Sequence, residues 1–144
     1  MKIAIATDHR GRDLKYEIID RIKNEFEIID CSLENTDIDD YPDFAFIVGE
    51  KVASGLAQFG VLICGTGIGM SIAANKVKGI RAAHCSSLEQ AHLAKEHNNA
   101  NIIALSYKQD IKELKSMIEE FINTPFSNEE RHARRVDKIK AMEK

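Results

Sequence analysis

The strongest constraint on the fold is the regular alternation of short β-branched segments with helical patterns along the whole chain. Segments in which apolar residues recur every three to four positions, the spacing of an amphipathic helix, separate the strand-like runs. Alternation of this kind with short connections is typical of right-handed crossovers and of a parallel sheet with helices on both faces. The sequence predicts five strands, at 2–7, 26–31, 60–64, 79–85 and 101–105.

We therefore expect an α/β fold built on a five-stranded parallel sheet. The expected strand order is 2-1-3-4-5, numbered along the chain, since this order places a reversal between the first and third strands. A last helix, over about 127–143, extends past the five-strand unit, with Ser127 as a capping residue and Glu130 three positions later. A chain of 144 residues suits one domain, 1–144, with one core.

The composition excludes several classes of protein. The net charge of −3 comes with no basic stripe of the kind that nucleic-acid binders carry. The longest apolar runs are strand-sized, well below the ~20 residues of a membrane span, and residues 1–9 do not resemble a signal peptide. The three cysteines include no C-x-x-C pair and are too few for a disulfide framework or a zinc site. We expect a cytoplasmic protein that uses no metal or cofactor.

A glycine-rich turn follows the third predicted strand in the stretch "LICGTGIGM", residues 62–70. Glycines at alternate positions let the backbone approach a ligand and point several N–H groups into one concavity, which a following helix makes more positive. The turn lacks the G-K-[ST] of a P-loop, and Met70 stands where a dinucleotide fingerprint has its third glycine. The turn suits an anion. The alternative is a tight strand-to-helix connection that binds nothing.

Cys64 stands at the mouth of this turn. A thiol buried in apolar surroundings is inert, whereas a thiol at a helix N-terminus forms the thiolate more readily. A thiolate base beside amides that can hold a negative oxygen fits the abstraction of a proton next to a carbonyl. The alternatives are a core cysteine at the end of a buried strand, or a nucleophile, although no acyl- or peptide-binding signature accompanies it.

Two further pairs of polar residues lie at the ends of predicted strands. Asp8 and His9 follow the first strand and are expected to face the glycine turn, because ligands bind beyond the carboxyl ends of parallel strands at a switch point. The alternative is that Asp8 caps a helix and His9 is merely exposed. His97 and Asn98 precede the fifth strand, which places them at its amino end unless the turn folds over.

Arg131 and Arg135 stand four residues apart in the last predicted helix and therefore share a face. Such a pair is commonly a solvated surface. It can also be a phosphate clamp, because guanidinium groups offer paired donors to phosphate oxygens. In a twofold dimer this clamp could reach the site of the neighbouring subunit.

Six segments, ATDHRG, DYPDFA, CGTGIGMSIAANK, GIRAAHC, EHNNAN and RHARRV, occur in this order along essentially the whole chain. Together they resemble the ribose-5-phosphate isomerase B family of sugar-phosphate isomerases, and the long cysteine–glycine segment is highly specific. The resemblance implies a Rossmann-like three-layer α/β/α sandwich that forms a homodimer or a tetramer. It also implies metal-free interconversion of D-ribose 5-phosphate and D-ribulose 5-phosphate in the pentose phosphate pathway.

The same resemblance implies a role for each matching residue. Cys64 would move a proton between C2 and C1 through a cis-enediolate, with Thr66 assisting at the sugar oxygens. His97 would open the furanose ring with Asp8 close by, and the phosphate would be held partly across the dimer interface. The residues implied to contact the substrate are Asp8, His9, Tyr41, Gly65, Thr66, Gly67, Ile68, Gly69, Met70, Asn98, Lys108, Arg131 and Arg135.

Two other functions remain open at this point. The family that this chain resembles also includes isomerases of allose 6-phosphate and galactose 6-phosphate. The depth of the pocket, which selects the length of the sugar, is not visible in a sequence. The presence of Cys64 together with His97 and both arginines favours a self-sufficient ribose 5-phosphate enzyme. A non-catalytic phosphate-sensing module could use the same fold. Lys108 stands where some members of the family have arginine, so it keeps the charge but loses the planar fork.

Overall fold

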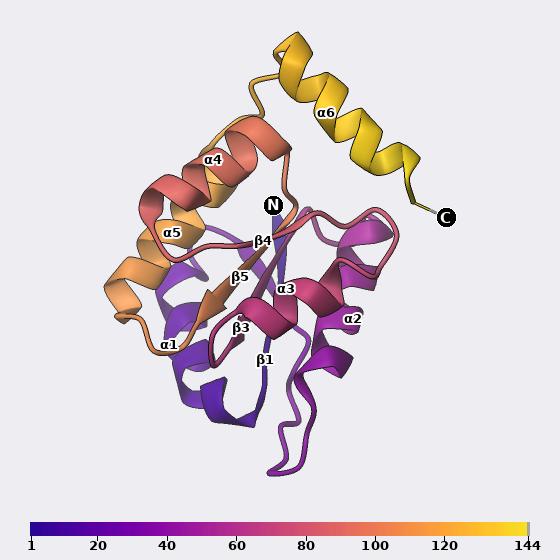
Figure 1. Ribbon diagram of the computed structural model, residues 1–144. Coiled ribbons are helices and arrows are strands. Elements are labelled where there is room, and N and C mark those ends of the chain that lie inside the picture. The colour runs from indigo at the N-terminus through magenta and orange to yellow at the C-terminus, as the bar shows by residue number, and fades with distance from the viewer. Residues whose placement is uncertain (144) are drawn as a thin grey trace.

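The computed structural model describes residues 1–143, and at its centre lies a five-stranded parallel sheet with helices on both faces (Figure 1). No helix in this part of the chain is long and apolar enough to cross a membrane. The strands are β1 (Lys2–Thr7), β2 (Glu27–Asp30), β3 (Phe59–Cys64), β4 (Ala82–His84) and β5 (Ile102–Ser106). The helices are η1 (His9–Gly11), α1 (Arg12–Ile22), α2 (Tyr41–Ala53), α3 (Ile68–Ala74), α4 (Leu88–Asn98), α5 (Ile111–Asn123) and α6 (Glu130–Ala141).

The sheet separates two buried clusters, because successive side chains of a strand point to opposite faces. On one face, branched residues such as Ile3 and Ile5 of β1 pack against α1, α4 and α5. On the other face, small residues such as Ala4 and Ala6 pack against α2 and α3, and Cys64 belongs to this cluster. The thiol at the end of β3 therefore points to the α2–α3 side of the sheet.

The predicted α/β class is confirmed, but the predicted order of the last two strands is wrong. The observed order is β2-β1-β3-β5-β4, so β5 and not β4 adjoins β3, with Cys64 beside Ser106. The reason lies in burial. Residues 102–105 are completely buried, as a central parallel strand requires, whereas β4 has only three residues and none of them is buried, which suits an edge.

Two helix boundaries also differ from expectation. His97 and Asn98 are the last two residues of α4 and not part of a turn. The last helix begins at Glu130 and not near Ser127, because Asn128 adopts a left-handed backbone conformation with φ of 54°. The Ser127 hydroxyl instead accepts a hydrogen bond from the Glu129 N–H at 3.3 Å.

Helices α4 and α5 are linked by a histidine held between two carboxylates. His92 of α4 lies with Nδ1 2.8 Å from Glu120 Oε1 of α5, and its Nε2 contacts Glu96 one turn further along α4. The hydrogen bond to Glu120, followed by the contacts with Glu96, raises the pKa of His92 above its usual value even though burial opposes the charge. The folded state therefore favours the protonated imidazole.

We expect this contact to make stability depend on pH. Because the pKa of His92 is raised on folding, its stabilisation is complete below the unfolded value of about 6.5 and is lost as pH rises through the folded value. Thermal unfolding of the wild type and of His92→Gln should therefore give melting temperatures that converge as pH is raised from about 6 to about 8. Parallel curves for the two proteins across this range would contradict the prediction.

Candidate active site

The carboxyl edge of the sheet carries the thiol and the glycine turn. Cys64 is the last residue of β3 and only 5% exposed, yet its Sγ accepts a hydrogen bond from the Gly67 N–H at 3.1 Å. On the neighbouring strand, the Ser106 hydroxyl donates to the Gly65 carbonyl oxygen at 2.7 Å and fixes the start of the turn. The sulfur thus contacts a backbone donor of the turn as well as the apolar core.

The turn crosses the end of β5 and reaches the edge strand β4. Gly67 has a left-handed backbone with φ of 83°, and a Cβ at this position would lie 2.8 Å from Cδ2 of His84 and 3.0 Å from the backbone of Leu105. The His84 ring in turn binds the Thr66 carbonyl oxygen through Nε2 at 2.8 Å. Only glycine fits at position 67, because both the conformation and the space exclude a side chain.

Several backbone N–H groups of the turn have no acceptor. The Ile68 N–H donates to Thr66 Oγ1 at 3.1 Å. The N–H groups of Gly65, Thr66, Gly69 and Met70 donate no hydrogen bond to any residue within 1–143. A cluster of unpaired donors beside a thiol can stabilise a negative oxygen that forms during a reaction.

Tyr41 flanks the turn from the α2 side. It is the first residue of α2, and its ring lies so close to Gly69 that a Cβ there would be 2.5 Å from the ring. The side chain remains 39% exposed. Its hydroxyl-bearing ring therefore borders the loop of unpaired donors.

Asp8 and His9 follow β1, which is the other neighbour of β3. The Asp8 carboxylate accepts hydrogen bonds from the N–H groups of Arg10 and Gly11 at 3.1 and 3.2 Å. Asp8 therefore caps the short helix η1, which was the alternative role considered for it. His9 is held by Asp39, with 2.7 Å between Nδ1 and Oδ1. Both residues lie at the switch point between β1 and β3 where the sequence predicts a site.

Lys108 is a further polar residue at the carboxyl edge of the sheet. It is exposed, two residues past the end of β5, and its N–H donates to the Ser106 hydroxyl at 3.2 Å. The carboxyl edge thus gathers one set of predicted residues, which we call the cysteine group: Asp8, His9, Tyr41, Cys64, Gly65, Thr66, Gly67, Ile68, Gly69, Met70 and Lys108. Within residues 1–143, no three His, Cys, Asp or Glu side chains gather in a way that could hold a metal ion.

The other predicted residues form a second set at the opposite end, which we call the arginine group: His97, Asn98, Arg131 and Arg135. The His97 ring lies 4.3 Å from the ring of His132 of α6, between centroids. His132 is buried, its Nδ1 lies 2.7 Å from the Ser127 hydroxyl, and burial followed by the charge of His97 lowers its pKa. Both arginines are exposed on α6.

One chain does not bring the two groups together. The cysteine group lies beyond the carboxyl ends of the strands, whereas α4 ends just before β5 begins, at the amino end of the sheet. Strands of five or six residues at about 3.3 Å per residue separate these ends by roughly 15–20 Å. In Figure 1, α6 and the end of α4 lie at the top, and the β3–α3 turn lies below the middle of the view.

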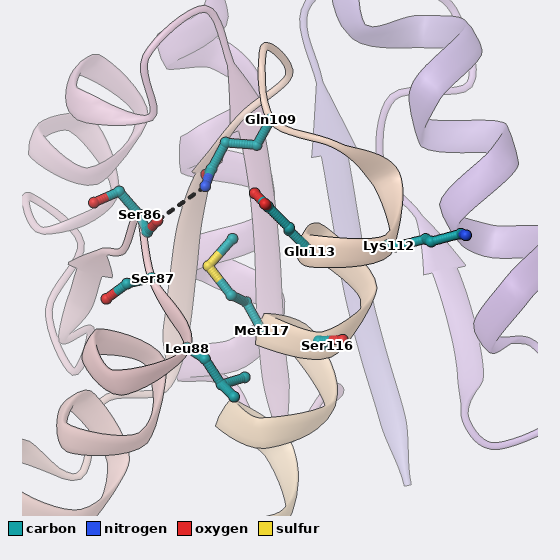
Figure 2. A pocket seen from close by; sticks show the side chains of 8 residues that line it. All are labelled: Ser86, Ser87, Leu88, Gln109, Lys112, Glu113, Ser116 and Met117. Carbon is teal, nitrogen blue, oxygen red and sulfur yellow. Dashed lines mark hydrogen bonds between the residues drawn. The ribbon is translucent and has the colours of Figure 1, made fainter.

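Neither of the two cavities beside α4 encloses the cysteine group. One, of about 430 Å³, lies between the start of α4 and α5, where the Gln109 amide donates to the Ser86 carbonyl oxygen at 2.9 Å (Figure 2). The other, of about 550 Å³, borders β4 and includes Asn98 and Ile139.

Sequence reasoning missed two residues that shape the site. His84 supports the turn from the edge strand β4, and the sequence around this histidine has nothing that distinguishes it from an ordinary core or surface residue. Asp39 holds His9 from a loop whose acidic composition predicts only a polar surface. In both cases the partner is distant in sequence, and local spacing carries no signal for such a contact.

The fold and the carboxyl-edge loop together define a class: a parallel α/β protein with a thiol and a turn of unpaired backbone N–H groups at the switch point of the sheet. The model of the family described as Ribose/Galactose Isomerase matches residues 3–139. The chain belongs to this family.

Individual relatives agree with this assignment. The chain is 44% identical to the probable ribose-5-phosphate isomerase B of Mycoplasma genitalium, over 99% of this chain and 95% of the relative. It is similar to the solved type B ribose 5-phosphate isomerase of Trypanosoma cruzi, with a TM-score of 0.94, 44% identity, and coverage of 99% of this chain and 98% of that chain. For the Mycoplasma genitalium structure with bound ribulose-5-phosphate, the TM-score is 0.91, the identity 42%, and the coverage 97% and 94%.

Proposed function

We propose that the protein is an aldose–ketose isomerase that interconverts D-ribose 5-phosphate and D-ribulose 5-phosphate in the pentose phosphate pathway. The observation that carries the proposal is the contact of the Cys64 thiol with a turn of unpaired backbone N–H groups. A relative at 42% identity was solved with ribulose-5-phosphate bound. Because a free thiol does the chemistry, the proposed setting is a reducing cytoplasm.

In the proposed mechanism, the Cys64 thiolate takes the proton from C2 of the open-chain aldose and returns it to C1. The electron pair of the broken C–H bond forms the C1=C2 bond of a cis-enediolate, whose negative oxygen O1 is held by the N–H groups of the turn. With Thr66 assisting at the sugar oxygens, the hydroxyl proton of O2 passes to O1, and C2 becomes the new carbonyl when C1 takes the proton back from the thiol. Each such N–H donor is worth about 2.7–4 kcal/mol in other enzymes. No step uses a metal or a cofactor, so the rate should be unchanged after treatment with a chelator.

The phosphate is distant from the reacting carbons and does not change. Its binding energy can therefore be used to hold C1 and C2 against the thiol. We assign the phosphate to His9 and the two arginines, and ring opening to His97 with Asp8 close by. Three further residues are proposed to position the sugar or its phosphate: Tyr41, Asn98 and Lys108.

The proposed site is shared between two chains of a homodimer, which can associate further into a tetramer. The roughly 15–20 Å between the two groups in one chain supports this arrangement, because a twofold axis can place the arginine group of one subunit against the cysteine group of the other. Large apolar side chains also flank both groups. Ile68 and Ile72 of α3 are 50% and 58% exposed, and Ile139 of α6 is 48% exposed.

A substrate panel tests the choice of sugar. We expect kcat/KM to be highest for D-ribose 5-phosphate among the five- and six-carbon aldose phosphates. A preference of about tenfold, or 1.4 kcal/mol, for allose or galactose 6-phosphate would instead assign the protein to a hexose phosphate.

Isotope exchange separates an isomerase from a phosphate-sensing module on the same scaffold. Ribulose 5-phosphate incubated with the protein in D₂O should gain deuterium at the carbon next to the carbonyl, as read by NMR or mass spectrometry. A wild-type protein that binds the sugar phosphate without any exchange would favour the sensor.

Two adjacent arginines of α6 offer a matched test of the phosphate clamp. Arg134 is engaged by Glu130 at 2.7 and 2.8 Å, whereas Arg135 is exposed and has no carboxylate partner within residues 1–143. We expect Arg135→Ala to raise KM for ribose 5-phosphate about tenfold or more, since a hydrogen bond to a charged group is lost. Arg134→Ala should leave KM close to that of the wild type. An unchanged KM for Arg135→Ala would remove this residue from the clamp.

A further inference from the structure

We propose that Asp39 is a positioning residue for phosphate binding: it holds the His9 imidazole with its Nδ1–H toward the protein and leaves Nε2 free for the substrate phosphate. The proposal rests on the role of His9 in the proposed function. Asp39 lies in the loop 31–40, between β2 and α2, and is not itself among the residues assigned to the substrate.

One oxygen of the carboxylate fixes His9 at two points. Asp39 Oδ1 lies 2.7 Å from His9 Nδ1 and also accepts the His9 backbone N–H at 3.1 Å. Because an ionised carboxylate can only accept, Nδ1 carries the proton in this pair. Burial acts to raise the pKa of Asp39, but the hydrogen bonds from His9 and Asn35 outweigh it and hold the pKa below its usual value.

The second oxygen fixes the carboxylate itself. Asp39 Oδ2 accepts hydrogen bonds from Asn35 Nδ2 at 3.0 Å and from the Thr36 N–H at 3.1 Å. With four donors on its two oxygens, and a side chain only 9% exposed, the carboxylate cannot rotate without losing hydrogen bonds. The imidazole therefore has one favoured orientation.

The loop that carries Asp39 is itself tied to the end of β1. The Ser32 hydroxyl accepts the Thr7 N–H at 3.1 Å, and Asn35 Nδ2 donates to the Thr7 carbonyl oxygen at 3.0 Å. Below the loop, the completely buried Lys15 donates to Asp30, to the Ser32 carbonyl oxygen and to the Ser32 hydroxyl, at 2.8 to 3.1 Å. The imidazole is thus supported by rigid structure, which lowers the entropy lost on binding.

The exposed nitrogen of His9 is the one left for a ligand. The side chain is 30% exposed, and Nε2 has no hydrogen-bond partner in the described part of the chain. In the protonated ring both nitrogens donate, Nδ1 to Asp39 and Nε2 to a phosphate oxygen. Without Asp39, the ring would be free to rotate and to place its proton on either nitrogen.

Nitrogen NMR of the histidine rings tests the tautomer directly. In the wild type, neutral His9 should be protonated at Nδ1, and in Asp39→Ala the proton should shift to Nε2. Asp39→Leu, which is close in size and has no acceptor, provides a second variant if the alanine protein folds poorly. Retention of the Nδ1–H form in whichever variant folds would overturn the proposal.

Kinetics separate positioning from loop stability. Asp39→Ala should raise KM for ribose 5-phosphate about tenfold, the value of one charge-assisted hydrogen bond, with kcat nearly unchanged. Ser32→Ala is the matched control, because it removes the hydrogen bond from the Thr7 N–H to the loop but leaves every hydrogen bond of Asp39 in place. An equal rise in KM in Ser32→Ala would mean that Asp39 acts only through the loop.

Binding of inorganic phosphate to the wild type distinguishes this proposal from the proposed function. Phosphate should perturb the His9 Nε2 resonance whether or not any sugar is turned over. If it does so in a protein that isomerises no sugar phosphate, the proposal for Asp39 stands and the proposed function fails. If the protein is an active isomerase and phosphate leaves His9 unperturbed, the proposal for Asp39 is overturned alone.

Discussion

Replacing Cys64 with alanine is expected to lower kcat for ribose 5-phosphate by about 10²–10⁴-fold, the usual contribution of a positioned general base. Binding should change little, because the phosphate is held by other residues. The thiol is nearly buried and contacts the Gly67 N–H, so alanine removes the base without introducing bulk. The measurements are the steady-state rate and the incorporation of deuterium from D₂O, and both should fall together.

A second cysteine provides the control. Cys31 follows β2, is half-buried and belongs to neither the cysteine group nor the arginine group. Cys31→Ser should therefore retain wild-type kcat. If Cys64→Ala retained full deuterium exchange, another group would have to be the base, and the proposed mechanism would be wrong.

Mixing two inactive variants is expected to restore activity. Cys64→Ala lacks the base of the cysteine group, and His97→Ala lacks the ring-opening residue of the arginine group. In a dimer with shared sites, the mixed dimer contains one site with both residues intact and one site with neither. Random exchange of subunits should give about one quarter of wild-type activity, because half of the dimers are mixed and each has one working site of two.

This experiment discriminates sharply between shared and separate sites. If each site were built within one chain, every site in the mixture would lack one residue, and activity would stay at the level of the parent variants. A control mixture of Cys64→Ala with the double variant Cys64→Ala/His97→Ala contains no intact base and should remain inactive. Refolding the chains together, or exchanging them at low concentration, ensures that mixed dimers form.

The sequence was sufficient to predict the α/β class, the parallel sheet and the reversal between β1 and β3. The predicted order of the last two strands was wrong, because strand order depends on which strands are buried on both faces. The completely apolar run 102–105 carried that signal, whereas "RAAH" at 81–84 contains two polar side chains that suit an edge. Burial pattern would have been a better guide than chain order.

The site was predictable only where it depends on local sequence. Cys64 and the turn after it follow from a strand, a row of glycines and a helix in succession. Long-range contacts such as His84 with Thr66 and Asp39 with His9 arise from the packing of segments far apart in the chain. The location of His97 at the amino end of the sheet follows from strand direction, and its proposed function requires a second subunit that no periodicity reveals.

The alanine-lined face of the sheet limits how this protein can diverge. Around Cys64, side chains at positions such as Ala4 and Ala104 are completely buried, and a Cβ added to Gly60 would lie 2.6 Å from Val48. Overpacking of this kind typically costs about 1–3 kcal/mol. A mutational library should therefore find the isoleucine and leucine positions of the opposite face open to exchange among branched residues, while the alanine and glycine positions on the side that carries the thiol accept only small ones.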